Sequence, residues 1–252
     1  MDTPYQWTKQ VASHWGGTRN GTIIHWPKGI AARNATRSQF HHVIDVVPTI
    51  LECAGLPQPM FVHGDQQMPL HGVSMKYSFD DASAAERHET QYFEMFVNRG
   101  IYHKGWTAVT RHSTPWVVEP LHPYDEDVWE LYDTNTDWSQ AHDLAAAMPE
   151  KLAEMQRLFL IEAVKYNVLP LDDRRIERFD PALAGRPVLA RGNSQLLFGG
   201  MGRLTENTVL NVKNKSDSVT AEVTVADAPA SGVIIAQGGA FGGWSLYCKD
   251  GR

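Results

Sequence analysis

Three strand-like runs with short links between them constrain the fold of this chain more than any other feature. β-Branched and aromatic residues fill 91–97, 101–110 and 128–133. Strands joined by short connections pair antiparallel, because a parallel pair needs a crossover of about a dozen residues or more. We place one turn at Asn98-Arg99-Gly100 and a bulge at Gly105. The region therefore predicts a small antiparallel sheet.

The clearest helix of the chain follows this predicted sheet. Pro149 suits its first turn, and Pro170 bars its extension. Its apolar stripe comprises Leu152, Met155, Phe159, Ala163 and Tyr166, widened by Leu158 and Ile161. A stripe at this spacing predicts a helix that packs on the sheet as core.

The first sixty residues show a different order of elements, namely a strand, a linker and a helix. Residues 22–26 predict a buried strand. Apolar residues at helical spacing predict a helix from about Val46, with Asp45 as its N-cap, Pro48 in its first turn and Gly55 at its end. This order is typical of the end of an α/β layer.

A long connection rich in Pro, Gly, Gln and His runs from residue 57 to about residue 85. His63, His71 and His88 lie in it or just after it, and we expect them to be solvated. The two cysteines form no C-x-x-C pair, and no H-E-x-x-H motif is present. We therefore expect no structural zinc site and no metal ligands in this chain.

The composition shifts after Arg186 to Val, Thr, Asn, Ser and Gly. Three further runs predict strands: 218–225, 233–236 and 244–248. The glycine run between the last two lacks the Gly-Lys-Ser/Thr ending of a phosphate loop. Asp250-Gly251 is a hairpin signal with no returning strand, so we expect an incomplete β-sandwich.

Charge and hydropathy exclude two classes of partner. The net charge of −6 gives no electrostatic reason to expect a nucleic acid. No apolar run is long enough to span a bilayer, so we expect no membrane partner. The first residues lack the basic start and apolar core of a signal peptide, and the compartment, cytoplasmic or periplasmic, stays open.

A lysine and a histidine lie just ahead of a glycine pair near the N-terminus: Lys9, His14 and Gly16-Gly17. Glycine adopts backbone conformations closed to other residues, so the pair can bend the chain sharply beside a ligand. The lysine offers three donors and a positive charge to an anionic oxygen. From these residues alone, a solvated lysine before an ordinary turn is an alternative.

Four segments follow one another along the chain: Lys9–Gly21, His42–Leu51 with Ala54-Gly55, Asn98–Trp106, and Trp129–Asp133 with Asp143–Ala145. In this order they resemble the C-terminal half of a type I arylsulfatase, closest to the bacterial enzymes of Pseudomonas type. The resemblance covers about residues 3–170. Each segment alone is weak, but four in the same order are specific.

The resemblance implies an α/β fold in three parts. Residues 1–60 would end an alkaline-phosphatase-like catalytic α/β sandwich, and 61–180 would form the small antiparallel sheet with its packed helix. Residues 186–252 would begin a jelly-roll or lectin-like β-sandwich, truncated here.

The resemblance also assigns a role to Lys9, which matches the lysine that contacts the substrate sulfate in similar enzymes. A fixed cation there stabilises both binding and the charge that develops on the leaving oxygen. His14 is a second candidate only because it lies near Lys9 in sequence.

Similar enzymes carry two groups whose sites we expect outside this sequence. One is a formylglycine made from the cysteine or serine of a Cys/Ser-x-Pro/Ala-x-Arg motif, which neither Cys53 nor Cys248 matches. The other is a calcium ion held by aspartates and an asparagine. We expect both sites to lie upstream, so the fragment alone should be inactive.

The resemblance thus implies an arylsulfatase that hydrolyses a small-molecule sulfate ester. Two alternatives stay open: a phosphonate monoester hydrolase or phosphodiesterase of the same superfamily, and a non-catalytic glycan-binding module formed by 186–252. An exposed Trp244 would favour glycan stacking, but we expect Trp244 to be buried in a core. The oligomeric state stays open.

Overall fold

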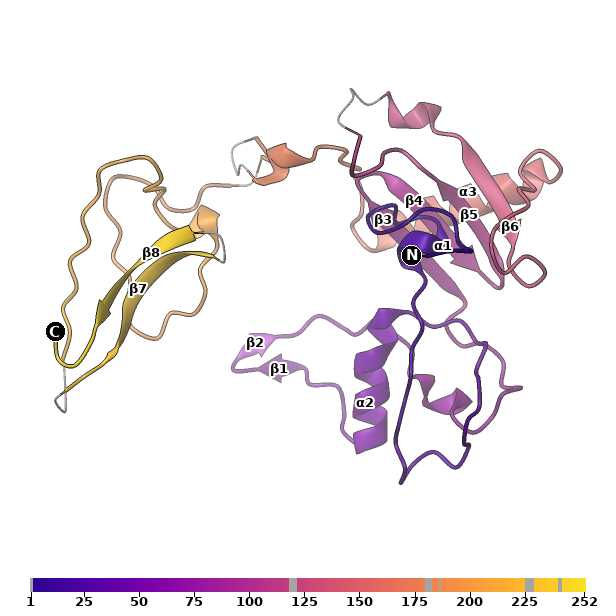
Figure 1. Ribbon diagram of the computed structural model, residues 1–252, viewed down its shortest axis with the longest axis horizontal. Coiled ribbons are helices and arrows are strands. Elements are labelled where there is room, and N and C mark those ends of the chain that lie inside the picture. The colour runs from indigo at the N-terminus through magenta and orange to yellow at the C-terminus, as the bar shows by residue number, and fades with distance from the viewer. Residues whose placement is uncertain (1, 118–121, 180–182, 186, 225–228, 240–241) are drawn as a thin grey trace. The chain divides into compact units, whose positions relative to one another are not determined.

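The computed structural model describes the chain except residues 1, 118–121, 180–182, 186, 225–228 and 240–241 (Figure 1). The chain divides into two compact units, Met1–Ile176 and Glu177–Arg252. Among the described residues, no helix is long and apolar enough to cross a bilayer. The boundaries predicted at residues 60 and 180 stay predictions.

The larger sheet of the first unit is a four-stranded antiparallel sheet (Figure 1). Its strands pair in chain order and are β3 (Thr90–Met95), β4 (Asn98–His103), β5 (Trp106–Thr110) and β6 (Trp129–Asp133). Because each strand pairs with the next through a short or looped connection, the predicted antiparallel sheet is confirmed.

The first turn of this sheet lies two residues earlier than predicted. Phe96 and Val97 form it with φ angles of 52° and 65°, and residues 98–100 belong to β4. Positive φ at both turn positions matches the twist of a two-residue hairpin, although Gly and Asn usually supply it. Gly100 lies inside the strand, where a Cβ would stand 3.0 Å from the carbonyl oxygen of Ser13 and make a tight contact.

The second turn corrects the bulge predicted at Gly105. Lys104 and Gly105, with φ angles of 48° and 82°, join β4 to β5 as a second two-residue hairpin. The single strand predicted for 101–110 is therefore two strands.

The helix α3 (Pro149–Lys165) packs on this sheet and supplies half of the core. The core cluster comprises Ile101, Ala108 and Leu131 of the sheet and Met155, Phe159 and Ala163 of the helix. Burying a side chain such as Phe159 stabilises the fold by roughly 1.5–3 kcal/mol. The predicted stripe is confirmed at its centre, but Ile161 is 60% exposed and lies outside it.

The predicted helix around residue 50 is present as η1 (Val43–Asp45) followed by α2 (Val46–Ala54). Asp45 occupies the N-cap position, Pro48 lies in the first turn, and Gly55 ends the helix with a φ of 66°. However, the apolar side chains whose spacing predicted the helix are largely exposed: Val43, Val46, Val47 and Ile50.

The buried strand predicted at 22–26 is not formed. These residues have no regular structure, and Ile23 is 96% exposed. β-Branched residues favour strands because they pack well on a pleated sheet, and no strand of the described chain pairs with this run. Residues 22–26 therefore stay without a strand, because their preference for strand structure is met by no neighbouring strand in the described chain.

Short elements complete the first unit. They are α1 (Trp15–Thr18), β1 (Phe61–Val62), β2 (Asp65–Gln66), η2 (Met75–Ser78) and η3 (Tyr124–Glu126). Two of them, β1 and β2, form a small hairpin within the connection predicted from residue 57 to about 85. The connection is not wholly superficial, because Met75 and Ser78 are buried.

In the second unit, β7 (Gly232–Gly239) and β8 (Gly242–Cys248) form one antiparallel hairpin. This confirms the strands predicted at 233–236 and 244–248. Residues 218–224 form no strand, contrary to the prediction, and 225 lies outside the described residues. Trp244 is 39% exposed, so the prediction that it is buried in a core is wrong. The glycan-stacking alternative stays a prediction, and so does the β-sandwich.

Two short helices, η4 (Ile176–Phe179) and η5 (Glu206–Thr208), precede the hairpin.

Candidate functional site

Lys9 lies at a corner of a β-turn formed by residues 8–11. The Val11 amide donates to the Thr8 carbonyl at 3.1 Å, and Gln10 has a φ of 75°, as the third position of a type II turn requires. The Lys9 side chain is exposed, and the described residues offer its ammonium no hydrogen bond or ion pair. The turn therefore presents an unpaired cation to solvent.

The glycine pair allows the segment that carries this turn to lie against α1. A Cβ on Gly16 would lie 2.2 Å from the carbonyl oxygens of Gln6 and Trp7, and one on Gly17 would lie 2.0 Å from that of Val11. Such distances exclude any side chain, so only glycine permits this approach. The Gly16 amide also donates to the Gln6 carbonyl at 3.1 Å. The sharp bend predicted for the pair is not formed, because Gly16 and Gly17 lie within α1 and neither has a positive φ. The pair serves this contact through its lack of a Cβ.

His14 is completely buried just before α1, and both of its ring nitrogens have partners. Nε2 lies 3.1 Å from Oε2 of Glu130, and Nδ1 lies 3.0 Å from the Ser13 hydroxyl oxygen. A neutral imidazole satisfies both contacts, with Nε2–H donating to the carboxylate and the hydroxyl donating to Nδ1. We call His14 and Glu130 the histidine–glutamate centre. It connects the N-terminal segment to β6.

Glu130 carries the negative charge of this centre. Burial favours its neutral form, but hydrogen bonds from His14 and from the Tyr132 hydroxyl outweigh burial and hold the pKa of Glu130 below its usual range. Burial, together with the Glu130 carboxylate, raises the pKa of Tyr132. The Gln6 side chain donates to the Tyr132 oxygen at 3.2 Å, which extends the network back to the N-terminal segment.

Two buried amide side chains fix the same segment to the sheet. Gln140 accepts from the Trp15 amide at 2.8 Å and donates to the Thr107 hydroxyl at 2.9 Å. Asn98 donates to the Gln10 carbonyl at 3.1 Å, directly behind the lysine. Asn98 of β4 thus holds the Lys9 turn directly, and Gln140, in the loop after β6, connects the start of α1 to Thr107 of β5.

A second cation lies beside this segment. The Arg111 guanidinium stands 4.6 Å from the centre of the Trp7 ring, and the Trp7 ring in turn contacts His14 edge-on. Arg111 also contributes to the low pKa of Glu130 through its charge. The surface around residues 7–9 thus carries positive charge on two exposed side chains.

The structure places the two predicted site residues in one segment but in different environments. Lys9 faces solvent, whereas His14 is enclosed. Glu130, Tyr132 and Gln140 were not among the predicted site residues. Glu130 and Tyr132 belong to the Trp-Glu-Leu-Tyr-Asp motif at 129–133, so the motif carried a signal that we used only for the fold.

Asp45 forms a second buried polar centre in the first unit. Its carboxylate accepts from the amides of His42 at 2.8 Å and Val73 at 2.7 Å, and from Nδ1 of His88 at 2.8 Å. Burial favours the neutral acid, but contacts with His41, His88 and the two amides outweigh it and lower the pKa of Asp45 strongly. Burial likewise opposes charge on His88, yet Asp45 raises the pKa of His88 above its usual value.

This Asp45 centre corrects one prediction about the loop histidines. His63 and His71 are exposed, as expected, but His88 is 5% exposed and fully bonded. Its Nε2 contacts the Gln91 side chain at 3.1 Å. A sequence pattern could not distinguish the three, because the partner of His88 lies 43 residues away.

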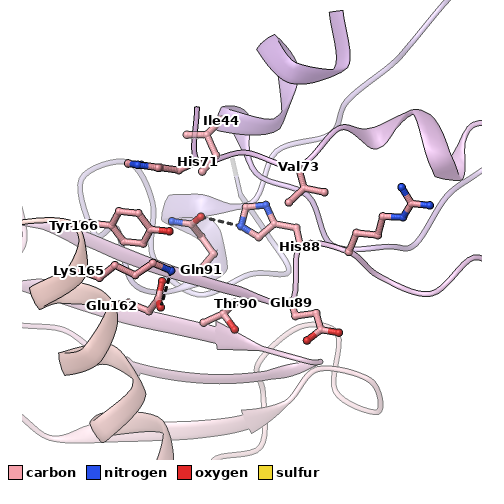
Figure 2. A pocket seen from close by; sticks show the side chains of 11 residues that line it. Ile44, His71, Val73, His88, Glu89, Thr90, Gln91, Glu162, Lys165 and Tyr166 are labelled. Carbon is pink, nitrogen blue, oxygen red and sulfur yellow. Dashed lines mark hydrogen bonds and ion pairs between the residues drawn. The ribbon is translucent and has the colours of Figure 1, made fainter. Parts of the chain in front are cut away.

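A cavity of about 200 Å³ adjoins the Asp45 centre (Figure 2). Figure 2 shows His71 beside Tyr166, His88 bonded to Gln91, and Lys165 paired with Glu162. His88, Glu162 and Lys165 already have polar partners, whereas His71 contacts only the Tyr166 ring. The cavity lies between η1, β3 and α3.

Two of the solved structures that resemble this chain share low sequence identity with it. A protein in complex with its substrate, D-glucosamine-2-N,6-O-disulfate, is 23% identical with a TM-score of 0.43, over 61% of this chain and 30% of that chain. A second solved chain comes from work on the metabolism of multiple glycosaminoglycans by Bacteroides thetaiotaomicron. Its sequence is 18% identical and its TM-score is 0.44, over 62% of this chain and 31% of that chain.

Comparison of sequences is more informative. An uncharacterised sulfatase of Schizosaccharomyces pombe is 26% identical over 160 residues, which is 63% of this chain. The chain spans 27% of the length of that relative. The family described as N-sulphoglucosamine sulphohydrolase, C-terminal, matches residues 13–159, from Ser13 through the four-stranded sheet into α3. Since that match covers more than half of the chain, this protein belongs to the N-sulphoglucosamine sulphohydrolase C-terminal family.

Proposed function

We propose that this chain is the C-terminal part of a sulfatase, and that Lys9 contacts the sulfate group of the substrate. Membership of the family supports hydrolysis of sulfuric esters in general. The finer assignment, to an arylsulfatase of Pseudomonas type acting on a small-molecule sulfate ester, rests on the four sequence segments that resemble those enzymes. The exposed, unpaired ammonium of Lys9 on a fixed turn is the observation that carries the proposal.

The fixed position of the turn is what makes Lys9 suitable. A sulfate ester is an anion, and negative charge moves toward the leaving oxygen as the ester bond breaks. A cation that is already in place stabilises this charge without reorganisation during the reaction. Ordering one residue of free backbone costs roughly 1–2 kcal/mol. Here the close glycine contacts and the Asn98 hydrogen bond order the backbone before substrate arrives.

His14 is proposed as a positioning residue. Its ring is buried and bonded on both nitrogens, so it supports the segment between Lys9 and α1. Glu130 fixes the tautomer by accepting from Nε2.

The described residues match neither the formylglycine site nor the calcium site that such enzymes use. Cys53 lies within α2, Cys248 ends β8, and neither stands in the required motif. Ser83-Ala84-Ala85-Glu86-Arg87 has the letters of the serine form, but Ser83 is exposed in a surface turn, where its hydroxyl donates to Asp81 at 2.7 Å. The buried carboxylates Asp45 and Asp127 are paired with histidine or arginine rather than gathered as an oxygen cage for calcium. We propose that other parts of the full-length protein supply both groups.

The test uses the full-length protein with an aryl sulfate and an aryl phosphonate as substrates. Lys9→Ala should lower kcat/KM for the true substrate by about 10²–10³-fold, as expected for removing one preorganised donor from developing negative charge. Lys9→Arg should recover part of the loss. Lys28→Ala removes another exposed lysine and serves as the matched control with unchanged activity.

The outcomes separate the two parts of the proposal. If the wild-type protein hydrolyses no sulfate ester, the aryl sulfate included, the sulfatase assignment is overturned. Faster hydrolysis of the phosphonate would favour the phosphonate monoester hydrolase. Sulfatase activity that survives in Lys9→Ala would remove Lys9 from the site and leave the family assignment intact.

A further inference from the structure

The connection between β5 and β6 brings two histidines and an aspartate together, away from the Lys9 turn in sequence. His112 follows β5, Asp127 precedes β6, and His122 lies between them. One ligand atom of each residue lies within 4.8 Å of the other two. We propose that His112, His122 and Asp127, the His112 cluster, bind a divalent first-row transition-metal ion, with Zn²⁺ the best match.

The spacing of the three ligand atoms is close to what zinc requires. Oδ1 of Asp127 lies 3.0 Å from Nδ1 of His112 and 2.8 Å from Nε2 of His122. In a tetrahedral site with zinc bonds of about 2.0–2.1 Å, neighbouring ligand atoms stand about 3.3 Å apart. Each histidine nitrogen therefore reaches zinc spacing from Oδ1 after the ligands separate by a few tenths of an ångström.

The donor set selects the metal. Two imidazoles and one carboxylate suit zinc and its neighbours, and three protein ligands leave a position for water. Calcium prefers six to eight oxygen ligands, so two nitrogens disfavour it. The side chains of His112 and Asp127 are fully buried, whereas that of His122 is 48% exposed and gives the ion a path from solvent.

The surroundings of His112 supply a second, independent indication. Its Nε2 is buried and has no hydrogen bond, and Oδ2 of Asp173 lies 3.7 Å away. Metal bound at Nδ1 leaves the proton on Nε2, directed toward the Asp173 carboxylate. A histidine ligand whose other nitrogen donates to a carboxylate is the usual arrangement around protein-bound zinc.

With His112 neutral, the hydrogen-bond network without an ion explains the same atoms less well. Without an ion, Oδ1 of Asp127 accepts from both imidazoles. A neutral His112 that donates through Nδ1 then turns the lone pair of Nε2 toward another carboxylate, which is repulsive. A metal ion removes this conflict, because the lone pair of Nδ1 binds the ion and Nε2 carries the proton.

Local charge also favours a cation. Arg99 donates to Oδ2 of Asp127 at 2.6 Å, which orients the carboxylate and leaves Oδ1 for the ion. Its positive charge opposes a metal, but Asp127 and Asp173 together carry two negative charges, so the cluster with neutral histidines is net negative. Binding would join His122 to His112 and Asp127, which lie next to the ends of β5 and β6.

This proposal departs from our sequence-based expectation that the chain holds no metal ligands. The ligand spacing is H-x9-H-x4-D, which matches neither C-x-x-C nor H-E-x-x-H. Only the fold brings the three residues together.

The test titrates Zn²⁺ into the untagged 252-residue chain after removal of metal with a chelator. We expect one ion per chain by calorimetry, and a rise in Tm of roughly 5–10 °C at about 100 times Kd. Co²⁺ in place of Zn²⁺ should give the visible absorption of tetrahedral cobalt. Ca²⁺ at the same concentration should give neither signal.

Variants locate the site without relying on a buried substitution. His122→Ala changes a half-exposed side chain and should weaken Zn²⁺ binding about 10-fold or more, with the circular dichroism of the metal-free chain unchanged. Asp173→Asn should weaken it by about 10-fold through His112. His142→Ala removes an exposed histidine elsewhere and should bind as the wild type does. Equal affinity of the wild type and His122→Ala, or absence of Zn²⁺ binding by the wild type, would overturn the proposal.

Discussion

Replacing Asp45 by asparagine perturbs the most extensively bonded buried charge of the first unit. Asparagine keeps the shape but puts an NH₂ group where one carboxylate oxygen accepted hydrogen bonds. The amides of His42 and Val73 bond different oxygens of Asp45, so one of these donors must face another donor in either orientation. His88 also loses its anionic partner.

The expected loss of stability follows from these contacts. Removing one partner of a buried, hydrogen-bonded charge pair costs about 3–5 kcal/mol. For a unit of this size, each kcal/mol lowers Tm by about 2–4 °C. Asp45→Asn should therefore lower the Tm of the first unit by about 6–20 °C.

The two pKa shifts give the pH dependence its sign. The pKa of Asp45 is lowered on folding, so its contribution is present above about pH 4 and is lost as pH falls below that value. The pKa of His88 is raised on folding, so its contribution is complete below about pH 6.5 and is lost as pH rises through the raised value. The stability difference between wild type and variant should be largest between about pH 4 and pH 6.5. It should shrink but not vanish above that range, because the amide hydrogen bonds remain.

Thermal unfolding and hydrogen exchange of residues 41–55 measure these effects together. Asp65→Asn is the matched control, because Asp65 is an exposed aspartate in β2 and should change stability by less than about 0.5 kcal/mol. An Asp45→Asn variant as stable as that control near pH 6 would refute the reasoning about the amides. A stability difference that stays constant from about pH 6 to about pH 9 would refute the role of His88.

Two further pairs of variants test the packing. Gly17→Ala places a Cβ 2.0 Å from the Val11 carbonyl oxygen and should cost about 1–3 kcal/mol by urea unfolding, while Gly21→Ala, which meets nothing within 4 Å, should be neutral. Phe159→Ala should cost about 3–5 kcal/mol, because Phe159 is 2% exposed in the core. Ile161→Ala on the exposed side of the same helix should change stability by less than about 0.5 kcal/mol, and an equal loss in both helix variants would contradict the assigned packing face.

The sheet and α3 could be predicted because local patterns specify them, but the turns of the sheet could not. Asn98-Arg99-Gly100 carries turn-forming residues, yet the chain turns at Phe96 and Val97. Tertiary contacts decide the matter: Val97 is completely buried, and Gly100 meets the backbone of Ser13. The burial of Val97 and the backbone contact of Gly100 therefore override the local turn propensity of residues 98–100.

The supporting residues of the candidate site were beyond sequence analysis for a different reason. Lys9 could be selected because it stands in a recognisable segment. His14 and Glu130 are 116 residues apart, and Gln6 and Gln140 are 134 apart. No periodicity or motif links positions at such distances, so only the fold shows that they bond.

Helix α2 shows why a correctly predicted helix can still be misplaced in the packing. Its spacing indicates an apolar face, but Ile50 on that face is 60% exposed, and nine residues alone form only a marginal helix in water. Hydrogen bonds, rather than apolar packing, hold α2 in place. Thr49, 6% exposed, donates to the Asp45 carbonyl at 2.6 Å and accepts from the Met75 amide at 2.8 Å. The Asp45 carboxylate binds the neighbouring segments, so Asp45→Asn should loosen α2 where Ile50→Ala should not.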